Sequence, residues 1–211
     1  HGSARISTVD SARLRRELNA GRIVVVAGFQ GLAATEDITT LGRGASDTTA
    51  VAIAAELQAE RCEIYTDVDG IYTADPSLVP DARKLTNINY NEMLELANLG
   101  AKMNPRAVEI SAVYDIPLLV ASSFGDADGT LIHGGDTKME VRRAVTGVAV
   151  ERNVAKITVR GVADHPGIAA SLFEPLADAA ISVDVIVQNA SAEGLTDMTF
   201  TVSDADCERA L

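Results

Sequence analysis

Three short apolar runs alternate with helix-length segments along the first 122 residues of the chain. The runs are IVVVA (23–27), CEIYT (62–66) and PLLVAS (117–122). Runs of this length that are rich in β-branched residues are typical of strands covered on both faces. Helices are expected over residues 10–19, 47–60 and 91–97 and from about residue 105. Strands that alternate with helices predict an α/β fold, with a largely parallel sheet and helices on both of its faces.

A different order of elements begins after residues 129–145, an irregular and charged stretch that we interpret as a linker. The expected elements are a strand at 156–162, a helix at 167–179 and two alternating strands at 182–190 and 196–202. This β-α-β-β order makes up most of a ferredoxin-like unit. A last helix begins near Asp204, and the chain ends before a closing strand. We therefore expect two domains, residues 1–145 and 146–211, the second of them incomplete.

The composition narrows the class of protein further. The formal net charge of −12 at pH 7 argues against nucleic acid or an anionic membrane surface as the main partner. No run reaches the roughly 20 apolar residues of a membrane-spanning helix, and no basic and then apolar leader opens the chain. Cys62 and Cys207 form no C-x-x-C pair, so we interpret them as reduced thiols of a cytoplasmic protein. The histidines at positions 1, 133 and 165 are too scattered to indicate a metal site.

The stretch TTLGRGASDTTA (39–50) places a glycine turn, a cation and a carboxylate at the start of an expected helix, with Ser46 or Asp47 as its cap. A tight turn at Arg43 and Gly44 would direct free backbone N–H groups and the positive helix end into one crevice. Such a crevice suits an anion. An ordinary capped helix after a glycine turn is the alternative. The spacing does not fit G-x-x-x-x-G-K-[ST], so the stretch is not a Walker loop.

A second stretch, YTDVDGIYTADP (65–76), puts the polar pair Thr66 and Asp67 at the carboxyl end of an expected strand. Open α/β sheets bind their ligands at that end. A calcium loop is excluded, because Gly70 falls at the fourth loop position and no glutamate stands at the twelfth. A polar β-turn is the alternative interpretation. Lys102, in GAKMNPRA, would by itself indicate no more than a solvated lysine.

These stretches stand in a fixed order with others. The order is GFQG (28–31), TTLGRGASDTTA (39–50), CEIYTDVDGIYTADP (62–76), EMLELANLGAK (92–102) and PRAVEI (105–110). In this order they resemble the aspartate kinases, within the amino-acid kinase family. The stretch VRGVADHPGIAASLFEPLADAAISVDVIVQN (159–189) resembles the first regulatory ACT domain of the same enzymes. The resemblance covers essentially the whole chain, and the combination of motifs is highly specific.

The resemblance implies an αβα sandwich of the amino-acid kinase type, followed by a ferredoxin-like βαββαβ ACT domain. It also implies an enzyme that transfers the γ-phosphoryl group of ATP, with Mg²⁺, to the side-chain carboxylate of L-aspartate. Arg43 and Asp47 would be the catalytic residues and, together with Ser46, would bind aspartate. The implied ATP-binding residues are Thr66, Asp67, Tyr72, Asp75, Lys102 and Met103.

For the second domain the resemblance implies feedback control by an amino-acid effector, lysine and/or threonine. The implied effector-binding residues are Asp164, Gly167, Ile168, Ala169, Ser182, Asp184, Gln188 and Asn189. Backbone N–H groups at the start of the expected helix would receive the effector carboxylate. A β-α-β-β unit leaves one sheet edge uncovered, and such edges usually pair with another copy. We therefore expect a homo-oligomer of at least two chains.

The chain also departs from the family pattern. The Lys-x-Gly-Gly segment that binds phosphate and a second ACT domain are both missing from the sequence, so we expect a fragment that is inactive by itself. Ala45 stands where the family usually has glycine, and Ser77 where it commonly has arginine. Two alternatives follow. One is a non-catalytic regulatory subunit, and the other is an amino-acid kinase that acts on glutamate or carbamate.

Overall fold

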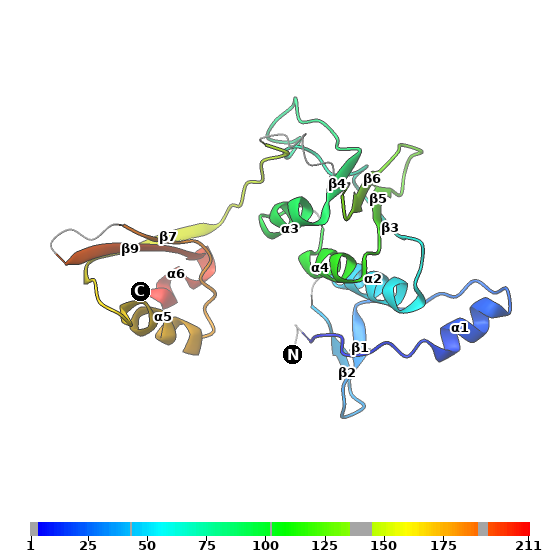
Figure 1. The fold of residues 1–211 in the computed structure, drawn as a ribbon, viewed down its shortest axis with the longest axis horizontal. Helices are drawn as coiled ribbons and strands as arrows, with labels where there is room; N and C mark the ends of the chain where they lie inside the picture. The colour runs from blue at the N-terminus through cyan, green and yellow to red at the C-terminus, as the bar shows by residue number, and fades with distance from the viewer. Residues whose placement is uncertain (1–3, 43, 102, 136–144, 190–193) are drawn as a thin grey trace. The chain divides into compact units, whose positions relative to one another are not determined.

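The computed structural model describes residues 4–42, 44–101, 103–135, 145–189 and 194–211. They fall into two compact units, the first unit His1–Val150 and the second unit Glu151–Leu211 (Figure 1). The helices of the first unit are α1 (Ala12–Asn19), α2 (Ser46–Leu57), α3 (Tyr90–Asn98) and α4 (Pro105–Tyr114). Its strands are β1 (Gln30–Leu32), β2 (Ile38–Thr40), β3 (Cys62–Thr66), β4 (Asn87–Asn89), β5 (Leu118–Ser122) and β6 (Thr130–His133).

The main sheet of the first unit has the strand order β3-β5-β6-β4. Strands β3 and β5 are parallel, as are β4 and β6, whereas β5 and β6 are antiparallel. The expected α/β class is thereby confirmed, but the sheet is mixed and the elements do not alternate strictly, since β3 and β4, α3 and α4, and β5 and β6 follow each other directly. Because β3 and β5 are parallel, with Thr66 opposite Ser122, both strands present their carboxyl ends at one edge of the sheet.

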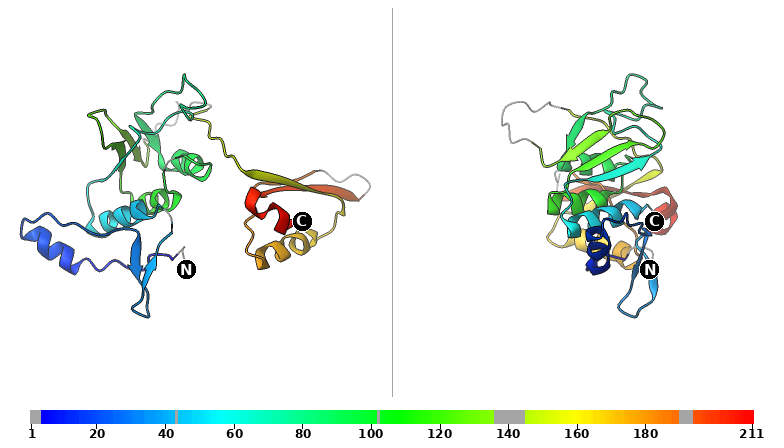
Figure 2. Two further views of the ribbon diagram at one scale, coloured as in Figure 1. Left: turned by 180° about the vertical axis from the view of Figure 1, so that it is seen from behind. Right: turned by 90° about the vertical axis from the view of Figure 1, so that its right-hand side faces the viewer.

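Helices α2, α3 and α4 pack with the sheet around one hydrophobic core (Figures 1 and 2). The helices contribute Val51, Met93 and Val108 to this core, and the strands contribute Leu118, Val120 and Ile132. Strand β3, which we expected to be covered on both faces, instead leaves the alternate side chains of Glu63 and Tyr65 exposed on one face. Within the ranges that the structure describes, these three helices cover only one face, so the expected helices on both faces are not found.

The expected strand at residues 23–27 is wrong for this structure. All five residues are described, and none belongs to a strand. The side chains of Ile23 and Val25 are 96% and 93% exposed. A strand needs a neighbour to accept and donate its backbone hydrogen bonds. The run has the composition of a buried strand, but no described strand pairs with it.

Two further expectations need correction. The stretch 129–145 contains strand β6, whose Thr130 and Ile132 alternate inward, so it is not wholly an irregular linker. Helix α2 has Ala45 as its N-cap residue, with no side-chain capping bond, so neither Ser46 nor Asp47 caps it. Ser46 instead donates a hydrogen bond toward the Asp47 carboxylate within the first turn.

The second unit contains β7 (Val154–Ala163), α5 (Ile168–Asp178), β8 (Ile186–Gln188), β9 (Leu195–Ser203), the 3-10 helix η1 (Asp204–Asp206) and α6 (Cys207–Ala210). Its sheet has the order β7-β9-β8, and both pairings are antiparallel. The rings of Phe173 and Phe200 meet edge to face in the core, with centroids 5.3 Å apart. Strand β8 is shorter than the expected strand at 182–190. Just before it, the Val185 N–H donates to the Thr201 hydroxyl and the Asp184 N–H donates to the Thr201 carbonyl, so the regular ladder is interrupted there.

Across both units, no described helix combines the length and the apolar composition needed to cross a membrane.

Candidate functional site

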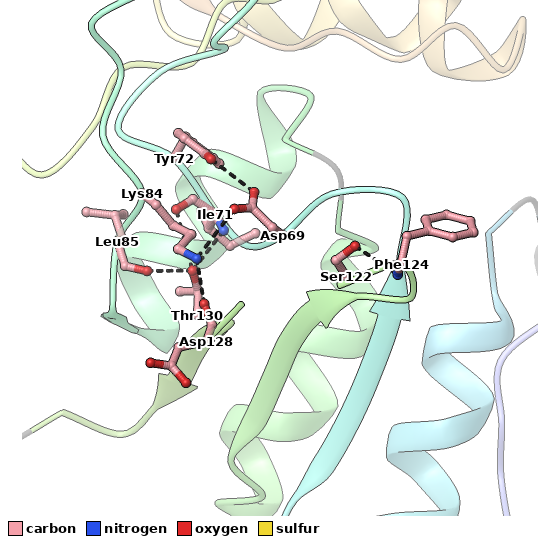
Figure 3. Close-up of polar contacts among 9 residues, drawn as sticks. All are labelled: Asp69, Ile71, Tyr72, Lys84, Leu85, Ser122, Phe124, Asp128 and Thr130. Carbon is pink, nitrogen blue, oxygen red and sulfur yellow. Dashed lines mark hydrogen bonds and ion pairs between the residues drawn. The ribbon is translucent and has the colours of Figure 1, made fainter. Parts of the chain in front are cut away.

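A polar edge forms where β3 and β5 end. Thr66 closes β3, and its hydroxyl donates a hydrogen bond to the Asp67 carboxylate at 3.1 Å. The Thr66 carbonyl accepts a hydrogen bond from the Ser123 N–H at 2.8 Å, which ties the two strand ends together. The exposed ring of Phe124 projects beyond Ser122 at the same edge (Figure 3). This is the edge at which open α/β sheets bind their ligands.

The loop that leaves this edge turns sharply at Gly70, where φ is +146°. A side chain there would place its Cβ 2.6 Å from the Thr130 hydroxyl oxygen, so the turn requires glycine. Beyond the turn, the Tyr72 hydroxyl donates a hydrogen bond to Asp69 at 3.0 Å (Figure 3). This bond lowers the pKa of Asp69 and raises the pKa of Tyr72. The Tyr72 hydroxyl is therefore held by the Asp69 carboxylate.

Asp75 lies further along the same loop and forms a turn with the next residues. Its carboxylate accepts the Ser77 N–H at 2.9 Å and the Ser77 hydroxyl at 2.7 Å. A side chain that bonds the backbone two residues later is a common way to fix a turn. Ser77, which stands where arginine was expected, therefore has a local role in the loop.

The starts of helices α2 and α4 form a second group. Gly44 has a φ of +70°, as a tight turn before α2 requires, whereas Arg43, the other residue of the expected turn, lies outside the described residues. The Asn104 side chain donates to the Gly44 carbonyl at 3.1 Å and accepts the Arg106 N–H at 3.0 Å. Asp47 accepts a hydrogen bond from the Asn104 backbone, and Met103, one residue earlier, is buried. Two helix N-termini therefore meet around Asp47, where their positive ends favour an anion.

Burial raises the pKa of the Asp47 carboxyl. The hydrogen bonds from Asn104 and Ser46 act in the opposite direction but are smaller effects. The physical reason is that a partly buried carboxylate loses hydration that these donors only partly replace. Asp47 consequently ionises less readily than an exposed aspartate.

Two residues of this group, Asn104 and Arg106, were not predicted from the sequence. Asn104 is the N-cap of α4, directly before Pro105, and an Asn-Pro pair ahead of a helix is a recognisable start signal. Arg106 donates to the Leu41 carbonyl at 2.7 Å and to the Ala4 carbonyl at 2.9 Å, and so holds the segment before the glycine turn. No local pattern could have indicated these contacts, because the partners are 65 and 102 residues away.

The predicted aspartate-binding and ATP-binding residues that the structure describes fall into two groups. Thr66, Asp67, Tyr72 and Asp75 lie on the edge and loop after β3, whereas Ser46, Asp47 and Met103 lie at the meeting of α2 and α4. Arg43 and Lys102 lie outside the described residues.

The second unit has a hollow of about 330 Å³ at the start of α5. Its lining residues are Asp164, His165, Pro166, Gly167, Ile168, Ala169 and Gln188. Five of the predicted effector-binding residues therefore share one hollow, and His165 and Pro166 are additions to the set. Ser182, Asp184 and Asn189 are not among its lining residues.

Comparison with known families gives this arrangement a context. The model of the amino acid kinase family matches residues 1–122, which is more than half of the chain. The chain belongs to the amino acid kinase family. In this family member the ACT domain model matches residues 157–211, which lie within the second unit.

Among known proteins, this amino acid kinase chain is similar to aspartokinases along its whole length. It is 51% identical over 216 residues to the aspartokinase of Corynebacterium glutamicum, covering 100% of this chain and 51% of that protein. It is 50% identical over 213 residues to the aspartokinase of Pseudomonas aeruginosa, covering 100% of this chain and 52% of that protein. The chain therefore spans about half the length of the curated relatives it matches.

A solved structure gives the same result for the fold. The E. coli aspartokinase III in complex with aspartate and ADP, in its R-state, superposes with a TM-score of 0.75 at 33% identity, over 92% of this chain and 42% of that one. The same enzyme with lysine and aspartate, in its T-state, superposes with a TM-score of 0.67 at 30% identity, again over 92% and 42%. The expected α/β kinase fold followed by an ACT domain, and the resemblance to the aspartate kinases, are thereby confirmed.

Proposed function

We propose that this chain is part of an aspartate kinase, which transfers the γ-phosphoryl group of ATP to the side-chain carboxylate of L-aspartate. The observation that carries the proposal is the 51% identity to an aspartokinase over every part of this chain. The E. coli relative that binds aspartate and ADP supports the same assignment. The alternatives, a regulatory subunit and a kinase of glutamate or carbamate, lack an observation of this kind.

The chemistry of this transfer needs positioning more than it needs a base. An aspartate carboxylate has a pKa of about 3.9 and is ionised at neutral pH, so no proton has to be removed. The difficulty is to bring one anion in line with a polyanion, which requires fixed positive charge and exact placement. The converging N-termini of α2 and α4 supply part of that charge. Mg²⁺ enters with ATP as part of the substrate and neutralises phosphate oxygens.

We assign aspartate binding to the group at the start of α2. Asp47 would bind the substrate ammonium group, Arg43 would bind a substrate carboxylate through its paired N–H donors, and Ser46 would fix the geometry. The expected test result is that Arg43→Ala in the full-length protein raises the KM for aspartate and lowers kcat. Loss of a charge-assisted contact typically costs about 1.5–3 kcal/mol. Kinetics equal to the wild type would remove Arg43 from the substrate site.

We assign ATP binding to the edge after β3 and to its loop. Thr66 and Asp67 would face the nucleotide, and the Tyr72–Asp75 stretch would border it. Lys102 and Met103, which precede α4 in the sequence, would complete the ATP-binding set. The preformed turn at Gly70 and the hydrogen bond from Tyr72 to Asp69 support this assignment, because a loop ordered in advance costs less to bind.

In the second unit we assign an amino-acid effector, lysine or threonine, to the hollow at the start of α5. Asp164 would bind the effector ammonium group, the N–H groups of Gly167, Ile168 and Ala169 its carboxylate, and Gln188 its polar end. Ser182, Asp184 and Asn189 stay predictions from the sequence. Aspartate kinase assays with each amino acid test this assignment. If Asp164→Ala and Gln188→Ala both leave inhibition complete, the effector binds elsewhere.

We also propose that the protein is a homo-oligomer that pairs through the second unit. Strand β8 is an edge strand, and its Ile186 and Val187 side chains are about half exposed. Light scattering should give at least a dimer for the wild type and a smaller mass for Val187→Lys. Val113→Lys, at an exposed position of α4, is the matched control and should leave the mass unchanged. A monomeric wild type would contradict the proposal.

The cytoplasmic location stays a prediction.

A further inference from the structure

We propose that Lys84 is a positioning residue for the nucleotide, which acts by holding Asp69 and, through it, the Tyr72 hydroxyl. The inference rests on the proposed function, because it takes the loop after β3 as the border of the ATP site. Lys84 belongs to none of the motifs that the sequence singled out.

The Lys84 ammonium group joins two segments that are distant in the sequence. Its Nζ donates a hydrogen bond to the Asp128 carbonyl at 2.6 Å and forms an ion pair with Asp69 at 3.4 Å (Figure 3). The Lys84 side chain is only 25% exposed, so this is not a freely solvated surface pair. The loop after β3 is thereby fastened to the turn that leads into β6.

The backbone sets the direction in which Lys84 reaches. Tyr72 and Lys84 form an antiparallel bridge, flanked by hydrogen bonds from the Leu85 N–H to the Ile71 carbonyl at 2.8 Å and from the Thr73 N–H to the Arg83 carbonyl at 2.9 Å. Residues directly opposite in such a bridge point to the same side. The Asp69 carboxylate therefore accepts the hydrogen bond from the Tyr72 hydroxyl and also pairs with the Lys84 ammonium group. It thereby fixes the position of the Tyr72 hydroxyl relative to Lys84.

Thr130, the first residue of β6, fastens this short ladder to the main sheet. Its side chain is fully buried, accepts the Ile71 N–H at 2.8 Å and donates to the Leu85 carbonyl at 2.6 Å (Figure 3). Buried hydrogen bonds of this kind are costly to break, because no water replaces them. The backbone of this ladder is therefore fixed. The ion pair between Lys84 and Asp69 then sets the orientation of the Tyr72 side chain.

The test uses Lys84→Met in the full-length protein, since methionine keeps most of the apolar stem and removes the charge. We expect the KM for MgATP to rise on the order of 10-fold, as loss of one charged hydrogen bond implies. The KM for aspartate should stay unchanged, and Lys84→Arg should restore most of the nucleotide affinity. A residue with only a structural role would lower stability without separating the two KM values.

A double variant tests whether Lys84 acts through Tyr72. If it does, Lys84→Met adds little once Tyr72→Phe has removed the hydroxyl, so the two effects are not additive. Arg61→Met is the matched control, because Arg61 pairs with Glu63 at the opposite end of β3. It should leave both KM values as in the wild type.

The outcomes separate this inference from the proposed function. A wild type that phosphorylates no aspartate overturns the proposed function, and calorimetry with MgADP then tests Lys84 by itself. A dissociation constant for MgADP that is unchanged in Lys84→Met overturns the inference, as does a wild type that binds no nucleotide. Equal increases in both KM values would also overturn it, while leaving the kinase activity of the wild type established.

Discussion

The backbone N–H of Val148 donates a hydrogen bond to the Thr73 carbonyl at 2.8 Å. Thr73 belongs to the loop that borders the proposed ATP site, and Val148 belongs to the segment that leads toward the second unit. Two residues earlier, the Thr146 hydroxyl donates to Glu92 at 2.6 Å, and Glu92 also closes the capping box of α3. The segment that connects the two units is therefore fastened, at its beginning, to the loop that borders the proposed ATP site.

We predict that Val148→Pro in the full-length protein raises the KM for ATP and weakens inhibition by the effector. Proline has no N–H, so the bond to Thr73 is lost. Steady-state kinetics with and without lysine or threonine provide the measurement. Val150→Pro, in the same segment, is the control and should have the smaller effect. Equal behaviour of the two variants would show that the Thr73 contact carries no coupling.

A second prediction concerns Gly129, at the turn between β5 and β6. A Cβ there would collide with the Val120 carbonyl and lie 3.0 Å from the Ala121 side chain. Overpacking of this kind costs about 1–3 kcal/mol, so Gly129→Ala should lower the free energy of unfolding by that amount in urea titrations. Gly125→Ala in the same connection is the control, since nothing lies within 4 Å of its Cβ. Equal stability of the two variants would contradict the packing.

The two cysteines should differ in reactivity. Burial raises the pKa of the Cys62 thiol to about 11, with the negative charges of Asp47 and Glu63 as smaller contributions. Because the thiolate is the reactive form, Cys62 stays almost wholly protonated at pH 8. Cys207 is partly exposed. Alkylation of the folded chain followed by peptide mass mapping should find Cys207 modified well before Cys62. Equal rates in the folded chain would be inconsistent with a buried Cys62.

The raised pKa of Asp47 predicts a pH effect on substrate binding. Only the ionised carboxylate binds an ammonium group, and burial shifts its protonation to higher pH. As the pH falls, the KM for aspartate should therefore rise before the substrate carboxylate itself protonates near a pKa of about 3.9. Asp47→Asn should have a high KM throughout and no such acid limb. An acid limb that persists unchanged in Asp47→Asn would assign it to another group.

Elements with a local signature could be predicted from the sequence. Helices α2 to α5 and strands β3, β5, β7 and β9 follow from periodicity and composition. Five of the residues that line the hollow at the start of α5 also lie close to that helix start or to the end of β8. The features that could not be predicted depend on contacts between residues that are distant in the sequence. Residues 23–27 have the composition of a strand, but pairing depends on a neighbour that no local pattern reveals. Lys84 bonds Asp128, which is 44 residues away, and Thr130 bonds Ile71, which is 59 residues away, so no local pattern indicates either contact.

The central claim, phosphoryl transfer to the side chain of aspartate, is tested most directly by trapping the product. Hydroxylamine converts an acyl phosphate into a stable hydroxamate, so the full-length protein can be incubated with ATP, Mg²⁺ and hydroxylamine, and with L-aspartate or L-glutamate as the acceptor. We predict aspartyl hydroxamate that requires both ATP and Mg²⁺, with no product from glutamate and a large loss in Arg43→Ala. The absence of aspartyl hydroxamate, or an equal yield from glutamate, would contradict the account.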